Sequence, residues 1–170
     1  MAGRAPRAPR RDHAVAAGRH ARFAVVAGRF NEHITKRLVS GALRALAAAG
    51  FSDGAVEVHW VPGAFELPQA AARLARTRRY AGVVCVGCVI KGATPHFEFV
   101  AGQAAAGIQR VALDTGVPTT FGVVTALTEE QAFERSGGEV GNRGEEAAEA
   151  AIEMAAFMQS LGRHGKAPKG

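Results

Sequence analysis

The stretch Val83-Val84-Cys85-Val86-Gly87-Cys88-Val89-Ile90-Lys91-Gly92-Ala93-Thr94-Pro95-His96 decides the fold of this chain. It begins with an apolar, β-prone run, passes through a glycine turn, and ends with residues typical of a helix start. We therefore predict a buried strand over 83–90 and a helix from His96 to about Leu113, capped by Thr94 with Pro95 at its first position. His96 would then lie at a helix N-terminus, where free N–H groups attract anions and favour a neutral imidazole.

The rest of the chain continues this alternation. Apolar runs predict strands over 23–27, 56–60 and 119–125, and helical spacing predicts helices over 34–49, 65–77, 128–136 and 142–161. Strands that alternate strictly with helices are typical of a parallel sheet with right-handed crossovers. We expect an α/β, three-layer αβα fold of flavodoxin-like kind, with a four-stranded parallel sheet and helices on both faces.

Length and charge predict one domain with two basic ends. The 170 residues suit a single core, and +5 of the net charge of +6 lies in residues 1–22. Three further basic residues lie in 162–170, which leaves 23–162 at about −2. We expect a disordered arm over 1–22, a domain over 23–161 and a basic tail over 162–170. Because the domain lacks a basic face with interleaved aromatics, we expect no nucleic-acid binding.

Two further features bear on location and metal binding. The N-terminal residues lack the apolar middle of a secretory signal, and the sequence has no run of about 18 apolar residues, so we expect a cytoplasmic protein without membrane contact. Cys85 and Cys88 form a C-x-x-C inside an apolar strand, without the second ligand pair that structural zinc needs. We expect buried, reduced thiols.

Ligands of parallel α/β sheets bind beyond the carboxyl ends of the strands, and this rule selects the candidate loops. Phe30 could stack on a flat heterocycle or pack the helix start, and Asn31 offers a donor and an acceptor. Glu66 could bind hydroxyl groups or compensate a helix dipole. Lys91-Gly92-Ala93-Thr94 suggests an anion-binding turn without Walker spacing, and His96 is a candidate base or a surface residue.

Two arginines near the C-terminal helix extend this set. Arg135 and Arg143 flank a glycine-rich segment. Either guanidinium could bind a phosphate through two hydrogen bonds or remain solvated.

Four motifs in order resemble those of the 6,7-dimethyl-8-ribityllumazine synthase family. They span about residues 23–160 and are Gly28-Arg-Phe-Asn-Glu32, Val61-Pro-Gly-Ala-Phe-Glu-Leu-Pro68, Gly87-Cys-Val-Ile-Lys-Gly-Ala-Thr-Pro-His96 and Gly141-Asn-Arg-Gly144. The resemblance implies the penultimate step of riboflavin biosynthesis, in which 5-amino-6-ribitylaminouracil and 3,4-dihydroxy-2-butanone 4-phosphate condense and release phosphate and water. It implies a transferase without cofactor or metal.

The resemblance also implies a role for each candidate residue. Phe30 would stack on the pyrimidine, and His96 would transfer protons during imine formation, phosphate elimination and ring closure. Further contacts to the pyrimidine and ribityl chain would come from Asn31, Ala64, Phe65, Glu66, Cys88, Val89, Ile90, Arg143 and, from a neighbouring subunit, Phe121. The phosphate would be bound by Ala93, Thr94 and Arg135.

The expected partners are the two substrates, further copies of the chain and riboflavin synthase. The family forms pentamers, in some members shells of twelve pentamers, with active sites between subunits. Glu139 departs from the family pattern, which often has a lysine there, and could alter the phosphate site near Arg135 or the assembly. It leaves open a second function, a catalytically weakened paralogue that binds flavin or lumazine or forms a shell. A flavodoxin-like FMN carrier is disfavoured because Gly28-Arg-Phe-Asn31 is not a hydroxyl-rich phosphate loop.

Overall fold

The computed structural model describes residues 17, 18 and 20–164 of the chain. Four strands form a parallel sheet in the order β2-β1-β3-β4. The strands are β1 (Phe23–Gly28), β2 (Val56–Val61), β3 (Gly82–Ile90) and β4 (Thr119–Ala126). The α-helices are α2 (Glu32–Ala48), α3 (Leu67–Arg76), α4 (His96–Thr115), α5 (Glu129–Glu134) and α6 (Arg143–His164), and two short 3-10 helices are η1 (Asp53–Ala55) and η2 (Ala64–Glu66).

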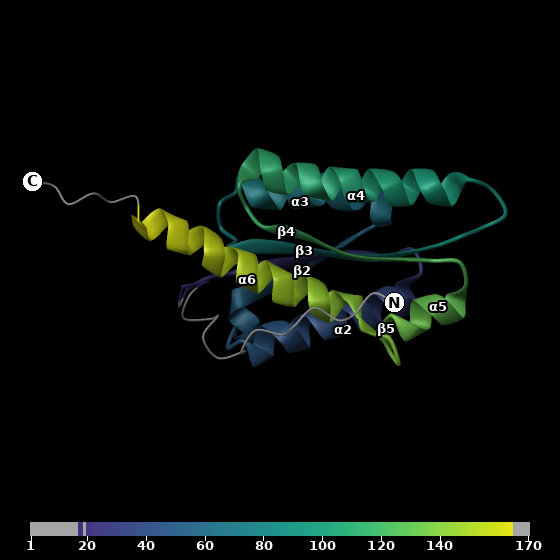
Figure 1. Cartoon of the computed structure of the whole chain (residues 1–170), viewed down its shortest axis with the longest axis horizontal. Helices are drawn as coiled ribbons and strands as arrows, with labels where there is room; N and C mark the ends of the chain where they lie inside the picture. The colour runs from purple at the N-terminus through teal and green to yellow at the C-terminus, as the bar shows by residue number, and fades with distance from the viewer. Residues whose placement is uncertain (1–16, 19, 165–170) are drawn as a thin grey trace, which may run out of the picture.

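The sheet is the middle of three layers. Helices α3 and α4 cover one face, and α2 and α6 cover the other (Figure 1). Alternate residues of β1 point to opposite faces, so Val25 and Ala27 pack with α2 and α6, whereas Ala24 and Val26 pack with α3 and α4. Because both faces are covered, the central strands are apolar along their whole length. The expected α/β, three-layer, flavodoxin-like architecture is confirmed.

The starts of two helices differ in detail from the prediction. Pro95, with φ −66° and ψ −1°, is the residue before α4, and the helix begins at His96. Among the described residues no side-chain hydrogen bond caps this end, so the expected capping by Thr94 is wrong. The fixed φ of proline already suits a helix, and Pro95 takes the place expected for Thr94. The segment predicted as one helix over 65–77 divides into η2 and α3, with Pro68 in the first turn of α3.

The sequence does not predict a short hairpin that lies between α5 and α6. Strands β5 (Ser136–Gly138) and β6 (Gly141–Asn142) pair antiparallel. The side-chain amide of Asn142 donates to the Arg37 carbonyl at 3.0 Å, and its oxygen accepts from the Gly144 N–H at 2.9 Å. The hairpin therefore ties α2 to the first turn of α6. Its glycine-rich sequence carries no strand signal, because those signals are β-branched and aromatic residues.

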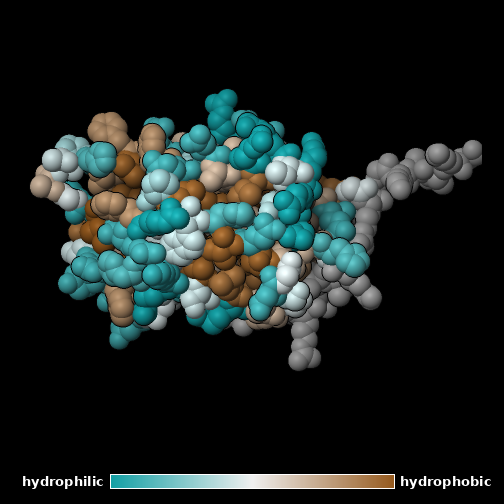
Figure 2. Space-filling model, turned by 180° about the vertical axis from the view of Figure 1, so that it is seen from behind, coloured by the Kyte–Doolittle hydropathy of each residue, from teal (hydrophilic) through white to brown (hydrophobic). Residues whose placement is uncertain are grey.

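The arm and tail expected at the two ends lie mostly outside the described residues. Within them, Ala17 is buried, and α6 continues to His164. None of the described helices is both long enough and apolar enough to span a bilayer. Apolar side chains also reach the surface of the domain, and Figure 2 shows an apolar area bordered by polar residues on the face opposite to that of Figure 1.

Candidate active site

A pocket of about 380 Å³ opens at the carboxyl edge of the sheet. Its walls come from the loops that follow β1 and β2, from the end of β3 and the turn after it, and from the first turns of α4. The lining residues are Phe30, Ala64, Phe65, Cys88, Val89, Ile90, Gly92, Thr94, His96, Phe97 and Val100. Most of the candidate binding residues are thus brought together in one cavity, at the edge where parallel α/β sheets bind ligands.

Backbone hydrogen bonds hold the first two of these loops side by side. The N–H of Arg29 donates to the Val61 carbonyl at 2.8 Å, and that of Phe30 donates to the Pro62 carbonyl at 3.0 Å. A Cβ atom at Gly28 would lie 3.1 Å from the carbonyl carbon of Gly63, which is tighter than nine in ten real Cβ contacts. Glycine at position 28 therefore permits the close approach that sets Phe30 beside η2.

Asn31 connects the same loop to the third strand. Its backbone is left-handed, with φ 57° and ψ 46°, a conformation that asparagine tolerates better than most residues. Its side-chain amide donates to the Cys88 carbonyl at 3.1 Å. Asn31 does not line the pocket. Its hydrogen bond instead connects the Phe30 loop to the pocket wall at Cys88.

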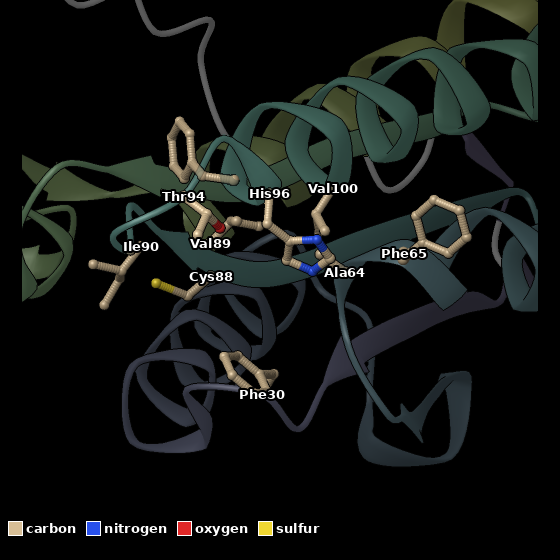
Figure 3. Close-up of a pocket in the computed structure, with 11 residues that line it drawn as sticks. Phe30, Ala64, Phe65, Cys88, Val89, Ile90, Thr94, His96 and Val100 are labelled. Atoms are coloured by element: carbon tan, nitrogen blue, oxygen red, sulfur yellow. The ribbon is translucent and has the colours of Figure 1, made fainter.

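Two aromatic rings stand at the pocket with much of their surface in contact with solvent. Phe30 is 72% exposed and Phe65 is 58% exposed, although an apolar ring gains free energy from burial. Figure 3 shows Phe30 and the imidazole of His96 on opposite sides of the space between their loops. A flat heterocycle between them would cover apolar surface that the chain leaves open.

His96 is the first residue of α4 and its ring points into the pocket (Figure 3). Val100, one turn later, lies next to it on the same face of the helix. Among the described residues His96 makes no side-chain hydrogen bond, and its nitrogens are open to a ligand. An imidazole in this position can accept and return protons.

The turn before α4 supplies the polar part of the pocket. Gly92 and Thr94 line it, and Ala93 is exposed between them without lining it. The first-turn N–H groups of α4 lack a side-chain acceptor, as a helix N-terminus that meets an anion requires. Glu66, in η2, does not line the pocket, and its backbone N–H donates to the Gly63 carbonyl at 3.3 Å.

Both cysteines are buried free thiols, as predicted. Burial raises the pKa of Cys85 to about 12. Burial, followed by the nearby Glu129 carboxylate, raises the pKa of Cys88 to about 12 as well. At neutral pH both are protonated, so Cys88 contributes an apolar surface and its backbone carbonyl to the pocket rather than a nucleophile.

Three candidate residues lie away from the pocket of their own chain. Phe121 is opposite Cys85 in the β3–β4 register, three residues before the level of Cys88, which is roughly 10 Å along the strand. Its side chain is 44% exposed on the outer strand of the sheet. Arg135 donates to the Gln131 carbonyl at 2.9 Å, and Arg143 is paired with Glu146. None of the three lines this cavity.

Three lining residues were not among the candidates: Gly92, Phe97 and Val100. A signal for Val100 exists in the sequence, because residues four apart share a helix face and His96 was already a candidate. Phe97 is adjacent to His96 and half-buried against the core under α4. Its part in the pocket depends on how far α4 is rotated about its axis, which the sequence leaves open.

A comparison with protein families agrees with this geometry. The family model described as 6,7-dimethyl-8-ribityllumazine synthase matches residues 20–159, which include every strand and pocket residue described above. The match covers most of the chain and places it in a transferase family of riboflavin biosynthesis. The chain belongs to the 6,7-dimethyl-8-ribityllumazine synthase family.

Proposed function

We propose that this protein is a 6,7-dimethyl-8-ribityllumazine synthase. It condenses 5-amino-6-ribitylaminouracil with 3,4-dihydroxy-2-butanone 4-phosphate and releases phosphate and water. The observation that supports this proposal most directly is the single pocket in which the exposed Phe30 ring faces His96 and the turn before α4. A flat diamine and a small anionic ketone need those features side by side.

The pyrimidine half of the site uses the loops after β1 and β2. Phe30 stacks on the ring of the diamine, and the backbone of Cys88, Val89 and Ile90 satisfies its polar edge. The ribityl chain lies along η2, where Ala64 and Phe65 line the pocket and the Glu66 carboxylate accepts hydrogen bonds from its hydroxyl groups. Asn31 contributes by fixing the Phe30 loop to β3 through Cys88.

The phosphate half uses the turn and the first residues of α4. Ala93 and Thr94 place the phosphate near the free N–H groups of the helix N-terminus. His96 removes and returns protons as the amine and the ketone form an imine with loss of water, phosphate leaves, and the ring closes with loss of a second water. Holding both substrates in one pocket makes the first step effectively intramolecular.

Completion of the site by a neighbouring subunit follows from the residues left outside it. We propose that Phe121 of one copy covers the pyrimidine pocket of the next, and that Arg135 and Arg143 complete the phosphate and pyrimidine contacts in the assembly. The expected assembly is a pentamer or a pentamer-based shell, with riboflavin synthase as a further partner. Exposed apolar areas such as that of Figure 2 are typical of surfaces that contact another chain.

The direct test is synthesis of the lumazine. The purified full-length protein is incubated with both substrates, and the product is followed by its absorbance and fluorescence. Formation of lumazine that depends on both substrates supports the proposal. A protein that binds riboflavin or lumazine tightly and yet forms no product would instead be the weakened paralogue. Glu139, the feature that leaves this alternative open, is exposed at the β5–β6 turn, and the described side-chain contacts of Arg135 are to Gln131 and Glu134 rather than to it.

A further inference from the structure

A hydrogen bond joins α5 to the start of α2 beside the pocket. Nε2 of His33 lies 2.7 Å from Oε1 of Glu129. A carboxylate can only accept, so the proton of this hydrogen bond is on Nε2 of the histidine. Glu129 is also close enough to Cys88, in the pocket wall, to raise the pKa of that thiol. The pair therefore bridges two segments that border the proposed pyrimidine site.

The two segments are anchored to different degrees. Helix α5 has its own cap: Oγ1 of Thr128 accepts from the Gln131 N–H at 3.3 Å, and the side chain of Gln131 accepts from the Leu127 N–H at 3.0 Å. Helix α2 begins after Asn31, and no side-chain hydrogen bond caps it within the described residues. The amide that would serve as its cap is directed to Cys88 instead.

Phe30 lies in the loop two residues before α2, so the position of the helix start sets the position of its ring. Asn31 holds an uncommon left-handed backbone, which relaxes unless its surroundings fix it. The tie from Asn31 to Cys88 holds one point of this turn. His33 holds a second point, against the separately capped α5.

We propose that the His33–Glu129 pair is a positioning device that sets the Phe30 ring for the diamine. The inference rests on the proposed function, because it assigns the pair to the pyrimidine half of that site. His33 and Glu129 are positioning residues and do not touch the substrate. Their side chains are 58% and 65% exposed, so the pair adds little to global stability and acts through local geometry.

A matched pair on the same helix separates this role from that of an ordinary surface ion pair. Nζ of Lys36 lies 3.4 Å from Oε1 of Glu32, with side chains 64% and 47% exposed. Both residues belong to α2, so their contact does not tie the helix to another element. If surface charge alone mattered, removal of Lys36 and of His33 would have similar effects.

The test compares steady-state kinetics of the assembled enzyme with His33→Ala, Glu129→Ala, the double variant, His33→Gln and Lys36→Ala. We expect His33→Ala and Glu129→Ala each to raise the KM for the diamine about threefold, with kcat and the KM for the keto-phosphate unchanged. The double variant should be no worse than either single one, because the pair acts as a unit. His33→Gln, which keeps an N–H donor, should restore most of the loss, and Lys36→Ala should behave as wild type.

Several results would overturn the inference. These are an unchanged KM for the diamine in His33→Ala, an equal rise in Lys36→Ala, or a double variant whose effects add. Riboflavin binding, followed by quenching of its fluorescence, gives a second readout that does not need turnover: equal affinity in wild type and His33→Ala also counts against the pair. Wild-type protein that forms no lumazine contradicts the proposed function and leaves this binding comparison to decide the inference.

Discussion

The two edges of the sheet use their polar side chains in opposite ways. At the amino edge, the carboxylate of Glu57 accepts from Tyr80 and pairs with Arg22 and Arg79, and Nε2 of His59 lies 3.4 Å from it; we call these residues the Glu57 cluster. At the carboxyl edge, the rings of Phe30 and Phe65 are exposed and His96 has no partner among the described residues. The Glu57 carboxylate is thus held by partners within the chain, whereas the His96 imidazole is left open to a ligand.

This contrast separates stability from function within one small domain. Substitutions at the amino edge should lower the melting temperature and leave kcat and KM unchanged. Substitutions at the carboxyl edge should change kcat or KM and leave the melting temperature unchanged. Four predictions follow from the contrast, from the largest expected effect to the smallest.

His96→Ala should lower kcat by about 10²-fold, the lower end of what one general base contributes, because proximity supplies much of the remaining rate. The melting temperature should not change, since the ring makes no described contact that holds the fold. His59→Ala is the matched control, because His59 belongs to the Glu57 cluster at the other edge. Equal losses of turnover in the two variants would contradict the assignment of catalysis to the carboxyl edge.

Arg135→Ala should raise the KM for the keto-phosphate about tenfold, which corresponds to the loss of one charge-assisted hydrogen bond. The KM for the diamine should change little. Arg44→Ala removes an exposed arginine whose side chain, within the described part of the chain, bonds to Ser40 of its own helix; this variant controls for the loss of positive charge. An unchanged KM for the keto-phosphate removes Arg135 from the proposed phosphate site.

Glu57→Gln should lower the melting temperature by a few degrees at pH 7 and leave kcat unchanged. The hydrogen bond from Tyr80, with the charges of Arg22 and Arg79, lowers the pKa of Glu57 below its usual 4.5. A lowered pKa means that the folded state favours the carboxylate, so this stabilisation is present above pH 4.5 and is lost as the pH falls through the folded pKa.

The pH dependence checks that explanation. Thermal unfolding of wild type and Glu57→Gln is followed from pH 7 down to pH 3. The difference in melting temperature should shrink as the pH falls below the unfolded pKa. A difference that stays constant over this range would show that packing, rather than the charge of Glu57, is responsible.

The smallest effect is expected at the cysteines. With pKa values of about 12, Cys85 and Cys88 are thiols at pH 8, so iodoacetamide should leave both unmodified in the native protein. Mass spectrometry should find both alkylated after denaturation. Rapid labelling of Cys88 in the native protein would mean that the pocket wall opens to solvent. It would contradict a role of β3 as a rigid support for the site.

Much of the fold could be predicted from the chain because its signals are local. Uninterrupted apolar runs mark strands buried on both faces, and helical spacing between them marks crossovers, which leaves a parallel sheet as the consistent arrangement. The hairpin of β5 and β6 could not be predicted in this way. It exists because Asn142 bonds to the backbone of α2, a contact between residues 105 positions apart in the chain.

The residues of the candidate site likewise divide into those that local signals predict and those that depend on packing. Phe30, Phe65, Thr94 and His96 follow strand ends, and the rule for parallel sheets places strand ends at one edge. Whether Phe97 and Val100 line the pocket depends on the rotation of α4 about its axis. The residue that precedes α4 is Pro95 rather than Thr94, a difference of one position from the prediction. Such shifts lie below the precision of a sequence pattern.

The sequence by itself determined the alternation of the four sheet strands with the helices, the largely apolar interior and the edge at which the candidate residues gather, because periodicity and turn residues act over a few positions. Only the tertiary structure decided that Asn31 ties its loop to Cys88 and that His33 reaches Glu129. It also decided that Arg135 and Arg143 lie outside the pocket of their own chain. These outcomes depend on distances between elements far apart in the chain, which are fixed by packing rather than by local propensity.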